Sequence, residues 1–315
     1  MLDLAIIGGG PAGLSAGLYA TRGGMEQVVM FEKGMPGGAI TQSSEVENYP
    51  GVSEVLTGIE LMEKWPEQCQ RFGLKHEMDE VTKLAINSDG TFKLSSASGS
   101  EYHSYSVIIA TGGRPRKAGF IGEDKFLGRG VSTCATCDGF FYKGKDVAVI
   151  GGGDTALEEA LYLAKICNKV FLIHRRDEFR AAPSIVDRIK TTPNIELVLD
   201  SEVLEAMGDM SGLNSLKVRN KTSKVERVLD VPGAFVFVGY DVNNELLKDD
   251  SGSFMCAVNE AGEVIVDLSM RTSVEGLYAA GDMRNFAPKQ VVCAASDGTI
   301  AALQAIAYVD SKKEG

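Results

Sequence analysis

The apolar positions of this chain repeat one order of elements twice. A short apolar run at 4–7 leads into a glycine-rich turn and then into a helical pattern, and the same series begins again at 147–150. Another apolar run, 28–31 or 170–173, completes each copy. The helix of the second copy has apolar residues three and four positions apart, which predicts one buried face: Leu157, Ala160, Leu161 and Ala164. The repeat therefore predicts two βαβ units of the same design.

Two further apolar segments lie outside the second copy. Residues 106–113 and 276–282 each show a short buried-strand pattern that ends in glycine. Because the second copy lies between them, we predict an α/β fold with two Rossmann-like dinucleotide-binding domains, the second inserted into the first. The first domain would comprise residues 1–114 and 245–315, and the second residues 115–244. Both crossings are polar and lack periodicity, which suits a hinge.

The glycine-rich turns predict nucleotide binding. In such a turn the first glycine permits a tight bend, the second lets the backbone approach a pyrophosphate, and the third lets the helix pack on its strand. The free N–H groups at the start of the helix then hold the diphosphate. These places are taken by Gly8, Gly10 and Gly13 in the first copy and by Gly151, Gly153 and Ala156 in the second.

The residue after the second strand of each copy predicts which nucleotide binds there. Glu32 suits an adenosine ribose with free 2′- and 3′-hydroxyls, because its carboxylate accepts hydrogen bonds from them. Arg175 follows Glu32 by 143 positions, the offset that also separates the two copies, and Arg176 and Arg180 lie close behind it. Three arginines in place of one carboxylate favour the 2′-phosphate of NADP over NAD. The alternative is a solvated basic segment at the start of a helix.

Composition and charge exclude several classes of protein. The 315 residues are 44% hydrophobic and 24% charged, and no apolar run approaches the roughly 20 residues that span a bilayer. A net charge of −11 argues against a nucleic-acid partner, which requires clustered lysine and arginine. We find no export signal, and six scattered cysteines do not form a secreted disulfide scaffold. The protein is therefore predicted to be cytoplasmic.

One pair of cysteines is closely spaced. Cys134 and Cys137 form a CxxC motif, a spacing that lets a disulfide form and break and that lowers the pKa of one thiol. A zinc site is the alternative, but the chain has no second CxxC or histidine pair, so we expect no metal. Asp138 follows at once and is a candidate proton donor to a sulfur when the disulfide is reduced. Its alternative role is to begin an Asp-Gly turn.

Seven segments together resemble the low-molecular-weight thioredoxin reductases of bacteria. The CATCDGFF and HRRDEFR segments are the most specific of them. The resemblance runs from end to end of the chain and is carried by GGGPAG (8–13), EVENYPG (45–51), ATGG (110–113), GRGVSTCATCDGFF (128–141), GGGDTALEEALYLA (151–164), HRRDEFRAAP (174–183) and GLYAAGD (276–282).

The resemblance implies an enzyme that uses FAD in the first domain and NADPH in the second to reduce the disulfide of thioredoxin. It makes Cys137 the sulfur nearest the flavin, Cys134 the nucleophile toward the partner, and Asp138 the proton donor. It implies FAD contacts at Gly8, Gly10, Pro11, Ala12, Gly13, Glu32, Gly38, Ala39, Asn48, Ala110, Thr111, Gly112, Asp282, Lys289, Gln290 and Val291. It implies NADPH contacts at Gly151, Gly153, Asp154, Thr155, Glu158, His174, Arg175, Arg176 and Arg180.

The resemblance also implies a partner surface, an assembly and a motion. Thioredoxin would dock near Arg129, Phe140 and Phe141, and the enzyme would be a homodimer. The family alternates between two domain orientations, and the polar crossings lie where such a rotation needs them. Three positions depart from the family pattern. Ala39 stands where a glutamine is usual, Lys289 where an arginine is frequent, and Cys293 where a hydroxyl is common. These departures bear on the redox potential of the flavin and on the choice of thioredoxin.

Other functions stay open on the sequence alone. The same relay would also serve another disulfide carrier, as in the flavoprotein of alkyl hydroperoxide reductase, but that relative carries extra thioredoxin-like domains before its first glycine turn. Here the turn begins at Gly8, which disfavours it. The related ferredoxin (flavodoxin) reductases lack the CxxC motif. A flavin-bound redox sensor that signals through Cys134 and Cys137 would need no NADPH site, so the arginine cluster disfavours it.

Overall fold

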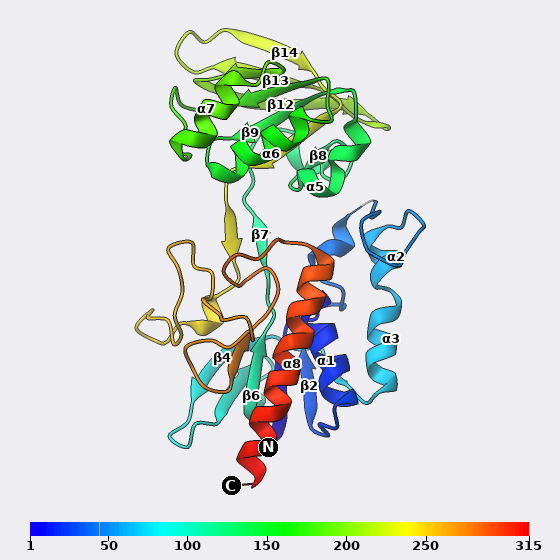
Figure 1. The fold of residues 1–315 in the computed structure, drawn as a ribbon, viewed down its shortest axis with the longest axis vertical. Coiled ribbons are helices and arrows are strands. Elements are labelled where there is room, and N and C mark those ends of the chain that lie inside the picture. Colours follow the sequence, from blue (N-terminus) through cyan, green and yellow to red (C-terminus); the bar gives the residue numbers. More distant parts are fainter. Residues whose placement is uncertain (44, 315) are drawn as a thin grey trace. The chain divides into compact units, whose positions relative to one another are not determined.

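The computed structural model describes residues 1–43 and 45–314 and divides the chain into two compact units (Figure 1). Unit 1 comprises Met1–Arg114 and Asp241–Gly315, and unit 2 comprises Pro115–Tyr240. The chain crosses from one to the other in β7 (Gly113–Pro115) and β16 (Tyr240–Val242), which pair with each other. Each unit contains parallel strands with helices between them, so the predicted fold class is confirmed.

A seven-stranded sheet forms the centre of unit 1. Its order is β3-β2-β1-β6-β5-β4, and β17 also pairs with β6. All pairs are parallel except β4 with β5 and β5 with β6. The register places Ile7 beside both Phe31 and Ile109, so three strands end together at one edge. The strands are β1 (Leu2–Ile7), β2 (Val28–Phe31), β3 (Lys75–Glu77), β4 (Val81–Ile86), β5 (Phe92–Ser96), β6 (Glu101–Ile109) and β17 (Leu277–Ala279).

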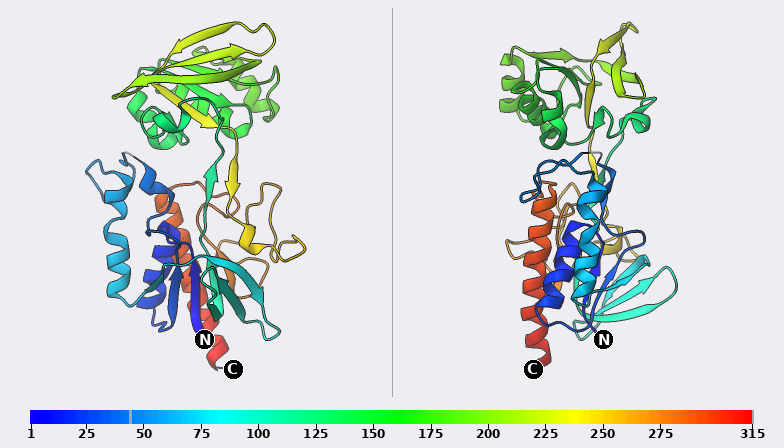
Figure 2. Two further views of the ribbon diagram at one scale, coloured as in Figure 1. Left: turned by 180° about the vertical axis from the view of Figure 1, so that it is seen from behind. Right: turned by 90° about the vertical axis from the view of Figure 1, so that its right-hand side faces the viewer.

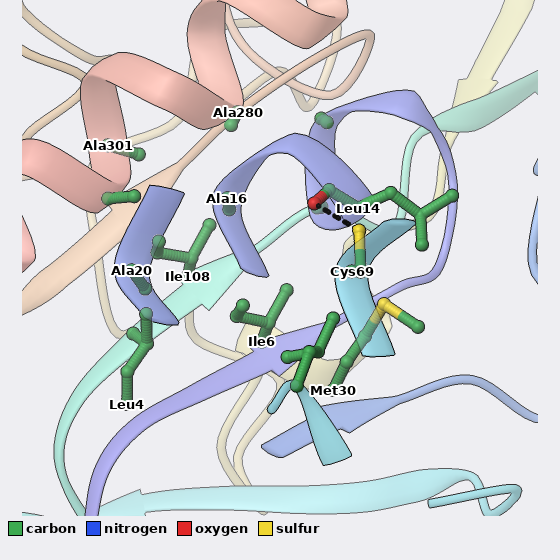
Figure 3. Packing of buried hydrophobic residues seen from close by; sticks show 14 of the residues in the cluster. Leu4, Ile6, Leu14, Ala16, Ala20, Met30, Cys69, Ile108, Ala280 and Ala301 are labelled. Carbon is green, nitrogen blue, oxygen red and sulfur yellow. Dashed lines mark hydrogen bonds between the residues drawn. The ribbon is translucent and has the colours of Figure 1, made fainter. Parts of the chain in front are cut away.

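Two helices of unit 1 pack together along small residues. α1 (Pro11–Arg22) and α8 (Val291–Glu314) run side by side, as Figures 1 and 2 show. Figure 3 shows Ala16 and Ala20 of α1 in one core with Ala301 of α8 and the apolar residues of β1. A side chain on Gly298 would collide with the backbone of Ala12, so the helices meet almost backbone to backbone. The other helices of unit 1 are α2 (Gly58–Met62), α3 (Lys64–Arg71) and the 3₁₀ helices η1 (Ala39–Gln42) and η3 (Glu245–Leu247).

The composition of α8 differs from the sequence-based expectation. α8 is long enough to cross a membrane, and its mean hydropathy of 1.4 over 18 residues is high enough for a spanning helix. On the sequence alone we expect no segment of that kind. Asp297 and smaller polar residues interrupt the apolar run, so the sequence pattern alone does not indicate a spanning segment. In the structure Ala301, Ala302 and Ala305 are buried in the core of unit 1. One face of α8 therefore belongs to the core of unit 1 and packs against α1, while 33% of its most apolar window is buried in total.

Unit 2 contains a five-stranded parallel sheet of order β11-β10-β9-β15-β8 and a separate antiparallel sheet of order β12-β13-β14. Its strands are β8 (Val131–Ser132), β9 (Asp146–Gly151), β10 (Lys169–Ile173), β11 (Ile195–Val198), β12 (Ser201–Asp209), β13 (Gly212–Asn220), β14 (Glu226–Asp230) and β15 (Gly233–Phe237). Its helices are α4 (Glu123–Phe126), α5 (Ala135–Asp138), α6 (Asp154–Ala164), α7 (Pro183–Thr191) and the 3₁₀ helix η2 (Gly139–Tyr142). The buried face predicted for α6 includes Leu157 and Ala160, and both are fully buried.

Candidate functional site

The first glycine turn joins β1 to α1 in unit 1. Gly8 has a φ of +110°, and a Cβ there would collide with the carbonyl of Ala110 after β6. Gly13 packs so closely on the carbonyl of Gly8 that no side chain fits. Gly10 precedes α1 without a side-chain cap, and Pro11 is the first helical residue. The N–H groups of the first helical turn are therefore available to an anion.

Glu32 follows β2 and contacts this turn. Its Oε2 accepts a hydrogen bond from the N–H of Gly9 at 2.8 Å, and its Oε1 accepts one from the N–H of Gly34 at 3.1 Å. These bonds fix the orientation of the carboxylate. A carboxylate has about four acceptor positions, so capacity for ribose hydroxyls remains. A phosphate at the same place would face a negative charge.

Asn243 holds the segment that follows β6. Its Nδ2 donates to the carbonyl of Thr111 at 2.9 Å, and Thr111 Oγ1 donates to the carbonyl of Asn243 at 2.7 Å. The N–H of Asn243 donates to the carbonyl of Gly112 at 3.0 Å. Asn243 belongs to none of the sequence motifs, because its partner Thr111 lies 132 positions away and leaves no local signal.

Several predicted flavin contacts come together in unit 1. Asn48 Nδ2 donates to Gln290 Oε1 at 3.2 Å, although the two residues are 242 positions apart. The N–H of Gly37 donates to the carbonyl of Gly9 at 2.8 Å, which brings the segment with Gly38 and Ala39 to the first glycine turn. Asp282 follows β17, which pairs with β6 and so ends at the same edge of the sheet.

A buried ion pair that the sequence did not predict lies beside this edge. Arg284 Nε donates to Asp297 Oδ2 at 2.7 Å, and its Nη2 donates to Oδ1 at 3.1 Å. The N–H of Gly281 also donates to Asp297 Oδ2 at 3.2 Å. Only 15% of the Arg284 side chain and 6% of the Asp297 side chain are exposed. The pair therefore ties the segment around Asp282 to the first turns of α8.

The second glycine turn joins β9 to α6 in unit 2. The N–H of Arg180 donates to the carbonyl of Gly152 at 2.8 Å, and the N–H of Ala182 donates to Asp154 Oδ1 at 2.8 Å. The segment after β10 thus folds back onto the turn and brings the arginines to it. The predicted contacts around the turn that are exposed are Asp154, Thr155, Glu158, Arg175, Arg176 and Arg180.

His174 is buried within this loop. Its ring stacks on Phe179 with centroids 5.4 Å apart, and its Nε2 lies 3.1 Å from the carbonyl of Glu178. A Cβ on Gly152 would collide with the ring. Burial lowers the pKa of His174, and the charges of Arg175 and Arg176 lower it further. His174 is therefore neutral at physiological pH and supports the turn from inside the loop.

The two cysteines of the CxxC motif form a disulfide, with their Cα atoms 5.4 Å apart. Cys134 precedes α5, and its Sγ accepts a hydrogen bond from the N–H of Cys137 at 3.2 Å. The N–H of Cys134 donates to Ser132 Oγ at 3.1 Å, which anchors the motif to β8. The N–H of Asp138 donates to the carbonyl of Cys134 at 3.2 Å, so its backbone closes the same helical turn.

The remaining cysteines have different surroundings. Burial raises the pKa of Cys69, Cys167 and Cys256 to about 11 each. Cys69 Sγ also donates to the carbonyl of Leu14 at 3.2 Å (Figure 3). These thiols stay protonated at neutral pH and are poor nucleophiles. In the described part of the chain, no group of three or more histidine, cysteine or acidic side chains is arranged to hold a metal ion.

The residues predicted to dock a partner lie close to the dithiol in sequence. Phe140 is 61% exposed, and the Lys143 ammonium lies 5.6 Å from the centre of its ring. Phe141 is partly buried in η2. Arg129 Nη2 donates to the carbonyl of Lys125 at 2.8 Å. An exposed aromatic ring beside a cation is a surface that a protein partner can cover.

Comparisons with known proteins agree with these features. Residues 2–298 match the family model described as pyridine nucleotide-disulphide oxidoreductase. A thioredoxin reductase of Helicobacter pylori is 58% identical over 310 residues, which cover 98% of this chain and 99% of that protein. A thioredoxin reductase of Peptoclostridium acidaminophilum is 42% identical over 99% of this chain and 98% of its own length.

Solved structures agree as well. The thioredoxin reductase of Streptococcus pyogenes has a TM-score of 0.92 at 35% identity, with 99% of each chain covered. That of Giardia duodenalis has a TM-score of 0.90 at 34% identity, with 98% of each chain covered. The chain therefore belongs to the pyridine nucleotide-disulphide oxidoreductase family and, within it, to the thioredoxin reductases of the low-molecular-weight type.

Proposed function

We propose that this chain uses NADPH to reduce the disulfide of thioredoxin, with FAD as its resident cofactor. The observation that carries the proposal is the Cys134–Cys137 disulfide. It lies in unit 2, which also contains the second glycine turn and the arginines that follow β10. The high identity to thioredoxin reductases over nearly the whole chain supports thioredoxin as the protein substrate.

Unit 1 has groups that fit FAD. The turn at Gly8 and the start of α1 offer N–H groups to a pyrophosphate, and the fixed carboxylate of Glu32 suits an unphosphorylated ribose. The segments with Asn48, Gln290 and Asp282 would hold the rest of the molecule. When bound, FAD would supply a two-electron carrier between a nicotinamide hydride and a disulfide.

The thiol chemistry follows from the CxxC motif. In the reduced protein, the Cys134 thiolate attacks one sulfur of the partner disulfide, which breaks that bond and releases the other partner sulfur as a thiolate. The Cys137 thiolate then attacks Cys134 Sγ, restores the Cys134–Cys137 bond and releases the second partner sulfur. The partner gains two electrons and two protons, and Asp138 is the proposed group that passes a proton to or from a sulfur.

The arginine cluster would select the coenzyme. A 2′-phosphate is dianionic near neutral pH, and guanidinium groups bind such oxygens in pairs. Arg175, Arg176 and Arg180 are exposed at the edge of the second glycine turn and are free of a buried structural role. We further propose a cytoplasmic homodimer that docks thioredoxin near Arg129, Phe140 and Phe141.

The test is NADPH oxidation by the FAD-loaded protein, followed with a bacterial thioredoxin and a disulfide chromophore. We expect turnover that depends on thioredoxin. Rapid flavin reduction without thioredoxin turnover would instead point to another disulfide carrier, such as a hydroperoxide-reducing protein. Absence of flavin reduction by NADPH would favour a redox sensor and would contradict the proposal.

A further inference from the structure

We infer that Lys221 is a fourth cation of the 2′-phosphate site and a determinant of coenzyme specificity. This inference rests on the proposed use of NADPH. Lys221 lies in the turn between β13 and β14, outside the five-stranded sheet that carries the glycine turn. It follows Arg175 by 46 positions and belongs to none of the sequence motifs, so the sequence alone does not predict a coenzyme contact there.

The backbone fixes this turn against the arginine loop. The N–H of Asp200 donates to the carbonyl of Arg176 at 3.1 Å, and the N–H of Lys221 donates to the carbonyl of Asp200 at 2.6 Å. Asn220 Oδ1 accepts hydrogen bonds from the N–H groups of Thr222 and Ser223 at 3.0 and 2.8 Å, which define the shape of the turn. Main-chain bonds through Asp200 therefore hold Lys221 near the segment that follows β10.

The side chain of Lys221 reaches the arginine loop directly. Its Nζ donates to the carbonyl of Arg175 at 3.3 Å, and the residue is exposed to solvent. An ammonium group has three donors, so this bond leaves two for an anion. The nearby carboxylate of Glu202 accepts its hydrogen bonds from Arg219, at 2.7 and 3.2 Å. These bonds lower the pKa of Glu202, and the charge of Lys221 contributes further to that lowering.

The charge balance of the loop explains why a fourth cation matters. Residues 174–180 contain three arginines but also the carboxylates of Asp177 and Glu178, which leaves a single net positive charge because His174 is neutral. Lys221 adds one further positive charge at the carbonyl of Arg175. A phosphate monoester carries about −1.5 to −2 charges at pH 7, so the added cation favours NADPH over NADH.

The experiment compares Lys221→Gln with Lys224→Gln in the FAD-loaded protein. Lys224 lies in the same exposed turn and loses the same charge, which makes it a matched control. Dissociation constants are measured by calorimetry for NADPH and NADH and for the fragments 2′,5′-ADP and 5′-AMP. We expect Lys221→Gln to weaken NADPH and 2′,5′-ADP about fivefold, as one exposed charge would, and to leave NADH and 5′-AMP unchanged. Lys224→Gln should bind all four ligands nearly as the wild type does, and Lys221→Arg should retain NADPH.

The outcomes separate this inference from the proposed function. If the wild type prefers NADPH and Lys221→Gln binds it equally well, the role of Lys221 is overturned and the proposed function stands. Equal losses for NADPH and NADH, or equal losses in the two glutamine variants, would also overturn it. A wild type without preference for NADPH would refute the coenzyme assignment itself, and the inference with it.

Discussion

At the scale of single residues, the two cysteines of the disulfide are predicted to have unequal roles. Replacing Cys134 with serine removes the sulfur that attacks the partner but leaves both glycine turns intact. We expect Cys134→Ser to abolish thioredoxin reduction, a loss of at least about 10³-fold, while NADPH still reduces the flavin at a normal rate. Stopped-flow absorbance and the thioredoxin assay measure the two steps separately. Turnover near the wild-type rate would show that the nucleophile is misassigned.

The arginines after β10 are predicted to act on coenzyme choice. Replacing Arg175 and Arg176 together with alanine removes two guanidinium groups that lie exposed beside the second glycine turn. We expect NADPH affinity to fall by about 30- to 900-fold, because two charge-assisted contacts of roughly 1 to 2 kcal/mol each are lost together. NADH affinity should change little. Equal losses for the two coenzymes in equilibrium titrations would contradict the 2′-phosphate assignment.

At the scale of elements, the Arg284–Asp297 pair joins the end of β17 to α8. Removing one partner of a buried ion pair leaves the other charge desolvated and uncompensated. We therefore expect Asp297→Asn to lower the free energy of unfolding by about 3 kcal/mol, measured by urea denaturation with FAD bound and without it. A similar loss in both forms would indicate that the pair stabilises the unit before any cofactor binds.

An exposed pair of the same unit provides the control. Lys83 Nζ lies 2.9 Å from Asp250 Oδ1, but 56% and 89% of these side chains are exposed. Solvent screens such a pair, so Lys83→Gln should change the free energy of unfolding by no more than about 0.5 kcal/mol. If the two variants lost equal stability, burial would not be the reason for the effect at Asp297.

At the scale of the whole molecule, an ion pair joins the two ends of the chain. Lys313 Nζ near the end of α8 lies 2.7 Å from Asp3 Oδ1 in β1, and only 4% of the Asp3 side chain is exposed. Figure 1 shows both termini at the same end of unit 1. Burial opposes ionisation of Asp3, but the Lys313 ammonium and the N–H groups of Gln27 and Glu26 outweigh it and lower its pKa below the usual 3.8.

This lowered pKa predicts a pH-dependent stability. A carboxyl whose pKa is lower in the folded state stabilises the fold above the unfolded-state pKa and loses that contribution as the pH falls through the folded-state value. We expect Asp3→Asn to be less stable than the wild type at about pH 6. The difference should shrink as the pH falls below 3.8, the usual value for the group. Thermal unfolding across this range measures it, and a difference that stays constant with pH would show that ionisation of Asp3 contributes nothing.

Local spacing along the chain determined much of this protein. The two βαβ units, their glycine turns and the CxxC pair were all predicted, because each depends on residues within a few positions of one another. The steric need for glycine at Gly8 and the helical stripe through Leu157 are set by bond geometry and helical periodicity, and the structure contains both. The family resemblance rested on the same short motifs.

Only the tertiary structure decided which distant groups meet. Asn243 beside Thr111, Arg284 bound to Asp297, and Lys221 at the carbonyl of Arg175 all depend on how strands from different parts of the chain pair. Hydrogen bonds and ion pairs act over a few ångströms, so a residue's partner is fixed by the folded path rather than by its place in the sequence. The same reason explains α8, whose apolar composition permits either a membrane or a protein core until α1 is seen packed against it.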